Sequence, residues 1–258
     1  MRYTQELCPI VYKEELAPGV FSLALTARAI AGTAEAGQFV NILCGSYALR
    51  RPISIAGFQA SSGILRLVFE VRGKGTAWLS ERQIGEKLDL VGPLGHGFPL
   101  LDREKKAVLV GGGIGTPPLL PVAMHYGGNA TAITGFRTAS AAILQSDFTV
   151  VGAAAVLCTD DGSAGFSGFT TAALEQRLAE APCDVIYTCG PKPMMRGVAA
   201  IAAARQILCY VSMEERMACG VGACLGCTCR TKDESGETHN TRVCTNGPVF
   251  DAAEVEWT

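Results

Sequence analysis

The first hundred residues carry short apolar and alternating runs that predict β-strands. Turn signals such as Pro18-Gly19, Gly45-Ser46 and Gly92-Pro93 separate these runs, and one helix is expected to begin near Thr76. Strands at this spacing are typical of a small antiparallel β-barrel. The expected strands are Leu7–Tyr12, Val20–Thr26, Phe39–Cys44, Ile53–Phe58, Ile64–Val71 and Lys87–Val91.

Beyond about residue 101 the pattern changes, because buried strands now alternate with helical stretches. Helices are expected at Pro118–His125, Thr171–Ala181 and Pro193–Arg205. Strands that alternate with helices predict a parallel, doubly wound α/β sheet. The expected strands are Ala107–Val110, Thr131–Phe136, Ala154–Cys158, Val185–Thr188 and Ile207–Val211.

A length of 258 residues suits one to three domains, and we expect a multidomain chain. The predicted units are the β-barrel (1–100), the α/β domain (101–211) and a small C-terminal module (212–258). A net charge of −2 implies no general affinity for nucleic acid or for anionic membranes. Every apolar stretch of the length that a membrane-spanning helix needs is interrupted by a charge, a proline or clustered glycines, so no transmembrane helix is expected.

The chain has eleven cysteines, but the N-terminus lacks the apolar segment of a signal peptide. Most cysteines outside a C-terminal quartet lie in apolar runs, as small buried hydrophobes do. We therefore expect a protein of the reducing cytoplasm. Residues 211–258 carry four Lys or Arg against eight Asp or Glu, which suits either a docking surface or an ordinary solvated one.

That quartet has the spacing of an iron–sulfur ligand set. Cys219, Cys224 and Cys227 follow the pattern C-x4-C-x2-C, and Cys244 comes after a polar loop, which matches plant-type 2Fe–2S sites. Four thiolates can also hold zinc, but zinc favours short paired knuckles. Cys229 is interpreted as a bystander, because we expect its side chain to point away from Cys227 if the loop continues as a strand.

Two motifs in the barrel are suited to binding phosphate. Arg51-Pro52-Ile53-Ser54 enters a strand, and an arginine can clamp a pyrophosphate bidentately. Since Pro52 and Ser54 would face one side and Arg51 the other, the strand must twist or lie edge-on for both polar groups to reach one ligand. Gly73-Lys74-Gly75-Thr76 opens the helix, where free N–H groups favour anions, although Thr76 could simply cap the helix.

Three loops at strand ends of the α/β domain indicate a nucleotide site. Gly111–Gly115 follows a buried strand and precedes a helix, which is the βα phosphate-binding arrangement without the usual Rossmann spacing. Cys189-Gly190-Pro191 and Asp160-Asp161-Gly162-Ser163 also follow strands. Ligands of doubly wound sheets bind at the carboxyl ends of the strands.

The order of these motifs resembles the ferredoxin–NADP reductase superfamily, in which a flavin-binding barrel precedes a nucleotide-binding α/β domain. The resemblance implies that FAD lies on the barrel, with Ile53 standing where the family often has tyrosine. The carboxylates of Asp160 and Asp161 would repel a 2′-phosphate, which favours NADH over NADPH. The implied FAD-binding residues are Arg51, Pro52, Ile53, Ser54, Val68, Phe69, Glu70, Gly75 and Thr76. The implied NAD-binding residues are Gly112, Gly113, Gly115, Asp161, Cys189 and Gly190.

The cysteines follow the reductase domains, and with Glu214–Cys219 this order resembles the electron transfer subunits of heteromeric dihydroorotate dehydrogenases. That resemblance implies an electron path from the FMN of a catalytic subunit, through a 2Fe–2S cluster and FAD, to NAD⁺ in pyrimidine biosynthesis. It also implies an assembly with two copies of each subunit. No pyrimidine-binding site is visible and no catalytic side chain is assigned here, so dihydroorotate oxidation would belong to the partner.

Three alternatives stay open at this point. The chain could be the flavoprotein subunit of a related NADH:acceptor oxidoreductase that acts on ferredoxin or sulfide. It could also be a stand-alone flavin reductase that acts on small acceptors. A zinc-stabilised nucleotide-binding module is the third possibility. Metal analysis would separate it from the others, because it would find zinc in place of iron and acid-labile sulfide.

Overall fold

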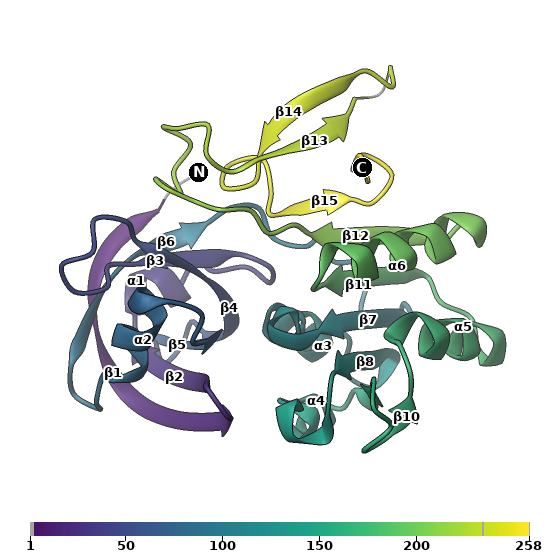
Figure 1. Ribbon diagram of the computed structural model, residues 1–258, viewed down its shortest axis with the longest axis horizontal. Coiled ribbons are helices and arrows are strands. Elements are labelled where there is room, and N and C mark those ends of the chain that lie inside the picture. Colours follow the sequence, from purple (N-terminus) through teal and green to yellow (C-terminus); the bar gives the residue numbers. More distant parts are fainter. Residues whose placement is uncertain (1–2, 234, 258) are drawn as a thin grey trace.

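The computed structural model describes residues 3–233 and 235–257, and its first six strands close into an antiparallel barrel (Figure 1). They are β1 (Thr4–Ala17), β2 (Val20–Thr26), β3 (Phe39–Ile42), β4 (Arg51–Gln59), β5 (Ile64–Glu70) and β6 (Lys87–Leu94). Hydrogen bonds join them in the order β1-β2-β5-β4-β3-β6, and β6 returns to β1. The predicted barrel is therefore confirmed, and its interior is filled by apolar side chains.

Strand β1 is much longer than predicted because it serves two neighbours. Its first part, from Thr4 to Pro9, pairs with β6, and the part from Ile10 to Ala17 pairs with β2. The register between β1 and β2 is irregular at two points. Bulges of this kind bend a strand and let a barrel close, and the alternation that a sequence pattern relies on is interrupted there.

The second half of the chain forms a seven-stranded sheet in the order β10-β9-β8-β7-β11-β12-β15. Its strands are β7 (Ala107–Gly112), β8 (Ala130–Phe136), β9 (Ala154–Thr159), β10 (Phe166–Ser167), β11 (Val185–Cys189), β12 (Leu208–Ser212) and β15 (Val249–Asp251). All neighbours are parallel except β15, which runs antiparallel to β12 at the edge. The doubly wound sheet is thus confirmed, with an antiparallel edge strand added.

Helices cover both faces of this sheet, and side chains of one strand alternate between them. Val108 and Val110 of β7 join the hydrophobic core under α5 (Thr170–Glu180) and α6 (Lys192–Ala204), whereas Leu109 joins the core under α3 (Leu120–Tyr126) and α4 (Gln145–Val150). This alternation follows from the two-residue repeat of a strand. The helices and turns, with two from the barrel first, are α1 (Arg28–Ala31), α2 (Lys74–Ser80), η1 (Gly113–Gly115), η2 (Pro117–Leu119), α3 (Leu120–Tyr126), η3 (Gly127–Asn129), η4 (Ala139–Ala141), α4 (Gln145–Val150), α5 (Thr170–Glu180) and α6 (Lys192–Ala204).

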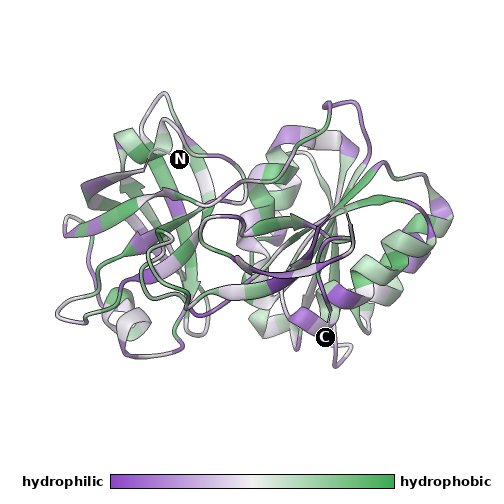
Figure 2. Ribbon diagram, turned by 90° about the horizontal axis from the view of Figure 1, so that it is seen from above, coloured by the Kyte–Doolittle hydropathy of each residue, from purple (hydrophilic) through white to green (hydrophobic). Residues whose placement is uncertain are grey.

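The C-terminal segment leaves the sheet and returns to it. After β12 it forms a loop and the hairpin β13 (Thr228–Lys232) and β14 (Thr238–Arg242), and then it pairs with β12 as β15. Figures 1 and 2 together place the hairpin over the edge of the sheet, on the side where β3 and β6 of the barrel approach. Backbone hydrogen bonds from Lys232 to Glu254 and from Glu256 to Arg230 fasten the hairpin to the chain end.

The barrel and the α/β sheet are joined through the strands that carry the predicted flavin motifs. Strand β4 contacts η2 and α3, and β5 contacts the glycine turn η1. An ion pair between Arg66 of β5 and Asp147 of α4 crosses the same junction. Two tyrosines hold the segment that joins the barrel to the sheet. Tyr126 Oη accepts the Leu101 N–H at 2.8 Å, and Tyr187 donates to the Pro99 carbonyl at 2.9 Å. Among the helices described, none has the length and apolarity needed to cross a bilayer.

Candidate electron-transfer sites

The loop between β12 and β13, residues 213–227, carries three of the four predicted cluster ligands and is here called the cluster loop. Two of its glycines, Gly220 and Gly222, adopt left-handed φ angles of 70° and 82°, which only glycine takes without strain. These turns bring the chain back on itself, so that Cys224 N–H donates to Cys219 Sγ at 3.4 Å. Gly226 N–H donates to Cys224 Sγ at 3.5 Å in the same way.

The N–H groups around Cys219 favour its thiolate. Burial alone would raise the pKa of Cys219, but N–H donors from Val221, Cys224 and Ala223 lower that pKa to about 6. Hydrogen bonds to the charged form of an acidic group such as a thiol lower its pKa. Metal-binding cysteines must be deprotonated, so a loop that favours thiolate before any ion is bound is suited to holding a cationic core.

The other thiols are buried and lie next to each other. Cys227 and Cys244 have exposed fractions of 1% and 0%, and Cys244 lies two residues beyond the end of β14. Burial, followed by the hydrogen bond and charge of Cys227, raises the pKa of Cys244 to about 11. The four thiols therefore interact mainly as two pairs, Cys219 with Cys224 and Cys227 with Cys244.

This pairing distinguishes between the two candidate metals. No three of the four Sγ atoms, all in the described part of the chain, lie within 4.8 Å of one another. Around one tetrahedral zinc with Zn–S bonds of about 2.3 Å, all four sulfurs would lie about 3.8 Å apart. A two-iron core needs two pairs of sulfurs, one pair for each iron. The donor set therefore fits a 2Fe–2S cluster better than zinc.

The expected direction of Cys229 is wrong. Cys227 and Cys229 both point into the hydrophobic core between the hairpin and the sheet, because residues two apart on an extended chain face the same side. Burial raises the pKa of Cys229 to about 11, with Glu215 adding to the effect. Cys229 thus lies near the cluster loop as a neutral, buried thiol.

The two predicted phosphate motifs of the barrel touch each other. A Cβ at Gly75 would lie 2.3 Å from Arg51 Nε, so the arginine of β4 lies against the first turn of α2. The Arg51 guanidinium donates to the Leu49 carbonyl at 2.7 Å. The Thr76 hydroxyl accepts N–H groups of Arg72 and Gly73 at 2.9 and 3.2 Å. Thr76 therefore closes the turn at the start of the helix, which begins at Lys74, two residues before Thr76.

Strand β4 presents its alternate residues to different surroundings. Pro52 pairs with Asn41 and Ser54 pairs with Phe39, and the side chains of these β3 residues point out of the barrel. Ile53 packs against the barrel core. Ser54 and Pro52 are consequently available to a ligand outside the barrel, whereas Ile53 would support it from behind.

On the adjacent strand β5 the three predicted flavin contacts also differ. Val68 is buried at the junction with the α/β domain, whereas Phe69 points into the barrel and stacks on Phe21 at 5.9 Å. Glu70 is half-exposed and pairs with Arg72 at 2.7 Å. Phe69 can therefore meet a ligand outside the barrel through its backbone but not through its ring.

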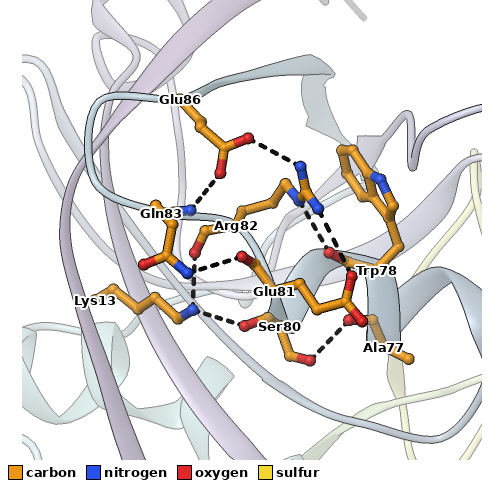
Figure 3. Close-up of polar contacts among 8 residues, drawn as sticks. All are labelled: Lys13, Ala77, Trp78, Ser80, Glu81, Arg82, Gln83 and Glu86. Atoms are coloured by element: carbon orange, nitrogen blue, oxygen red, sulfur yellow. Dashed lines mark hydrogen bonds and ion pairs between the residues drawn. The ribbon is translucent and has the colours of Figure 1, made fainter.

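The far end of α2 is fixed to the barrel by a separate network, shown in Figure 3. Lys13 Nζ donates to the carbonyls of Ser80 and Arg82 at 2.6 and 2.7 Å. The Arg82 guanidinium lies 4.3 Å from the Trp78 ring centroid and pairs with Glu86 at 2.9 Å. Contacts at this end hold the helix in place, so that its glycine end stays against Arg51.

The glycine turn of the α/β domain meets the predicted Cys-Gly-Pro loop. A Cβ at Gly115 would lie 2.5 Å from the Cys189 carbonyl oxygen, and one at Gly112 would lie 2.7 Å from Met194 Sδ. Gly190 has a φ of 154° and backs directly onto Gly112. Gly113, with a φ of 52°, has no heavy atom within 4 Å of the Cβ position. Two loops of adjacent strands thus form one close-fitting edge with open space above Gly113.

Two features of this edge were not predicted. The Thr116 side chain is fully buried, and its Oγ1 has no hydrogen-bond partner among the residues that the structure describes. Burial raises the pKa of Cys189 to about 12, so its thiol is neutral at physiological pH. A buried hydroxyl without a partner next to a glycine turn is suited to a polar ligand group.

Asp161 lies at the same edge but two strands away, at the end of β9. Its Oδ1 accepts the N–H and the hydroxyl of Ser163 at 2.9 and 2.6 Å, and these bonds lower its pKa. Asp161 N–H in turn donates to the Arg137 carbonyl. Arg137 is thus a backbone neighbour of Asp161 with an exposed, cationic side chain, and the sequence interpretation did not take it into account.

Known proteins with this arrangement carry a consistent name. A family model described as the iron–sulfur cluster binding domain of dihydroorotate dehydrogenase B matches residues 214–256, which include the cluster loop. The "Dihydroorotate dehydrogenase B (NAD(+)), electron transfer subunit" of Geobacillus thermodenitrificans is 39% identical over 259 residues, covering 97% of this chain and 98% of that one. The chain belongs to this family. The subunit of the same name from Streptococcus mutans is 37% identical over 258 residues, covering 97% and 98%.

Solved structures support the fold of this dihydroorotate dehydrogenase B family member. An NADH-dependent reduced ferredoxin-NADP oxidoreductase superposes with a TM-score of 0.87 at 30% identity, covering 98% of this chain and 90% of that chain. A ferredoxin reductase of carbazole 1,9a-dioxygenase has a TM-score of 0.70 at 21% identity, covering 80% and 67%, and this likeness concerns the fold alone.

Proposed function

We propose that this chain passes electrons between NAD(H) and an FMN-containing dihydroorotate dehydrogenase catalytic subunit. The observation that carries the proposal is the contact of the cluster loop, whose Cys227 lies next to Cys244, with strand β3, beside the strand β4 that bears Arg51 and Ser54. The expected flow is from partner FMN through the cluster and FAD to NAD⁺, as pyrimidine biosynthesis requires. Dihydroorotate itself would be oxidised on the partner.

The chain's own residues position three groups. When bound, FAD exchanges a hydride with NAD(H) and single electrons with a 2Fe–2S cluster, which is chemistry that belongs to the cofactors. Arg51 and the first turn of α2 would hold the FAD pyrophosphate, with Ser54 and Val68 beside the flavin. The glycine turn and the Cys189-Gly190 loop would hold the nicotinamide half of NAD. The cluster ligands would be Cys219, Cys224, Cys227 and Cys244.

We assign one cofactor to each part of the chain. Residues 1–100 would bind FAD, residues 101–211 would bind NAD, and residues 212–258 would bind the cluster. The third part shares strand β15 with the α/β sheet, which would keep the cluster at a fixed position relative to the other two groups. The eleven cysteines are all free thiols, as suits a protein of the cytoplasm.

The partner is proposed to dock over the cluster loop, around residues 214–230, with two copies of each subunit in the assembly. Leu225 in this loop is 76% exposed, whereas Met217 and Val221 are partly covered by the adjoining core. An exposed leucine at the mouth of a buried redox site is suited to contact with another protein.

Anaerobic addition of NADH to the purified holoprotein tests the proposal. Bleaching of the flavin absorption followed by the electron paramagnetic resonance signal of a reduced 2Fe–2S cluster is the expected result. A cluster that stays oxidised, or metal analysis that finds zinc, would contradict it. The structural likeness to a ferredoxin-NADP oxidoreductase suggests a second candidate, ferredoxin as the acceptor. Ferredoxin reduction without any response to the catalytic subunit would favour that candidate.

A further inference from the structure

Asn41 is a buried amide that joins the barrel to the cluster loop. It lies on β3, where the neighbouring side chains Val40 and Ile42 fill the barrel, so the alternation of the strand points Asn41 outward. Its Nδ2 donates to the carbonyl of Cys219 at 3.3 Å. The side chain is only 1% exposed, so the cluster loop covers a polar group of the barrel.

The contact is close on both sides. A Cβ at Gly220 would lie 2.4 Å from Asn41 Nδ2, which means that the loop approaches Asn41 where only a glycine fits. Asn41 Oδ1 is buried and has no hydrogen-bond partner among the described residues. The Cys219 carbonyl fixes which amide atom is the donor, because a flipped amide would place two oxygens together. A buried acceptor left without a partner is costly for folding, so this position is not optimised for stability alone.

Asn41 also lies beside the proposed flavin strand. It is the cross-strand partner of Pro52, the residue after Arg51 in β4. Its backbone carbonyl accepts from Arg50, whose guanidinium pairs with Asp89 of β6 at 3.0 Å. Asn41 thus connects the first cluster cysteine, through a hydrogen bond, to the strand next to the flavin, and Arg50, itself paired with Asp89, holds Asn41 in place.

We propose that Asn41 is a positioning residue that fixes the cluster loop against the flavin strand and so sets the separation and coupling of the two redox groups. The inference rests on the proposed cysteine ligands and flavin strand. The Asn41 N–H group also points at the carbonyl of Cys219. Its partial positive charge would there stabilise the extra negative charge of a reduced cluster. Removal of the amide therefore affects electron exchange and cluster potential, and not only folding.

The test uses Asn41→Leu, which keeps the branching at Cγ and removes both amide groups, in the holoprotein. After anaerobic mixing with NADH, flavin reduction keeps its wild-type rate. Cluster reduction slows severalfold, because the rate of electron transfer between two groups falls steeply as their separation increases. The cluster potential shifts downward, its paramagnetic resonance spectrum changes, and amide exchange in residues 214–226 accelerates.

Gln38→Met is the matched control, because Gln38 is a buried amide that bonds Gly95 and Glu35 away from the cluster loop. It is expected to lose stability without slowing cluster reduction. Should Asn41→Leu lose its cluster, Asn41→Ala, which removes the amide without adding bulk or charge, carries the test through the potential. Wild-type cluster reduction and potential in the Asn41 variants overturn the inference. A wild-type cluster that NADH never reduces would instead overturn the proposed function.

Discussion

The Arg51 guanidinium occupies the space that a side chain at Gly75 would need, since a Cβ there would lie 2.3 Å from Arg51 Nε. The arginine enters β4 and the glycine lies in the first turn of α2, so two motifs more than twenty residues apart form one structure. Each motif alone is a weak indication of a phosphate site. Their direct contact supports the proposal that one pyrophosphate lies between them.

Gly75→Ala should therefore weaken FAD binding. The new methyl group displaces Arg51, and loss of a charge-assisted hydrogen bond of about 1.5–3 kcal/mol corresponds to roughly 10- to 100-fold in affinity. Flavin content after dialysis measures the effect. Gly128→Ala is the control, because Gly128 lies outside the barrel and a Cβ there meets nothing closer than 4.0 Å. Equal FAD affinity in both variants would separate Arg51 from the flavin.

The ligand set predicts different results for neighbouring cysteines. Replacement of Cys219, Cys224, Cys227 or Cys244 by serine should lower iron and sulfide content, because each thiolate belongs to one of the two pairs. Cys229→Ser should keep the cluster and lose about 1–3 kcal/mol of stability, since a hydroxyl replaces a buried thiol. Iron retention in Cys244→Ser together with iron loss in Cys229→Ser would reverse the assignment.

The sequence predicted the order of the elements well, because barrel strands and the βα units carry clear periodicity. It missed β10 and β15, which are too short for a periodic signal and depend on a distant neighbour for pairing. Spacing alone identified the four cysteines. Asn41 could not be found in this way, because one asparagine in an apolar strand gains its meaning only when residue 219 is folded onto it. Arg137 was passed over for a similar reason.

Contact between the two loops of the α/β domain should be needed for NADH but not for FAD. Gly115→Ala places a methyl group 2.5 Å from the Cys189 carbonyl and forces the loops apart. NADH should then reduce the flavin on the order of 100-fold more slowly, while flavin content stays at the wild-type level. Gly128→Ala, with nothing closer than 4.0 Å to its Cβ, is the control. Wild-type hydride transfer in Gly115→Ala would place NAD elsewhere.

Nucleotide preference tests the role of Asp161. Carboxylates near a 2′-phosphate cost about 1–3 kcal/mol, so wild-type kcat/KM should favour NADH over NADPH by roughly 5- to 150-fold. Asp161→Asn should narrow the ratio, and loss of the neighbouring cation in Arg137→Ala should widen it. Hydrogen bonds from Ser163 hold the pKa of Asp161 below its ordinary value of 3.8, so Asp161 stays ionised at neutral pH. The preference for NADH over NADPH should therefore not change across neutral pH. Equal rates with both nucleotides would refute this role.

The most direct test of the account is dihydroorotate-dependent reduction of NAD⁺, measured as NADH formation with the purified chain and an FMN-containing catalytic subunit. The isolated chain should oxidise NADH with artificial acceptors and show no dihydroorotate turnover. The mixture should produce NADH. Leu225→Asp should keep the artificial-acceptor activity and lose both the complex on a sizing column and the coupled reaction, because it charges the exposed leucine at the cluster loop. NADH formation from dihydroorotate by the chain alone, or no formation by the mixture, would contradict the proposed division of labour.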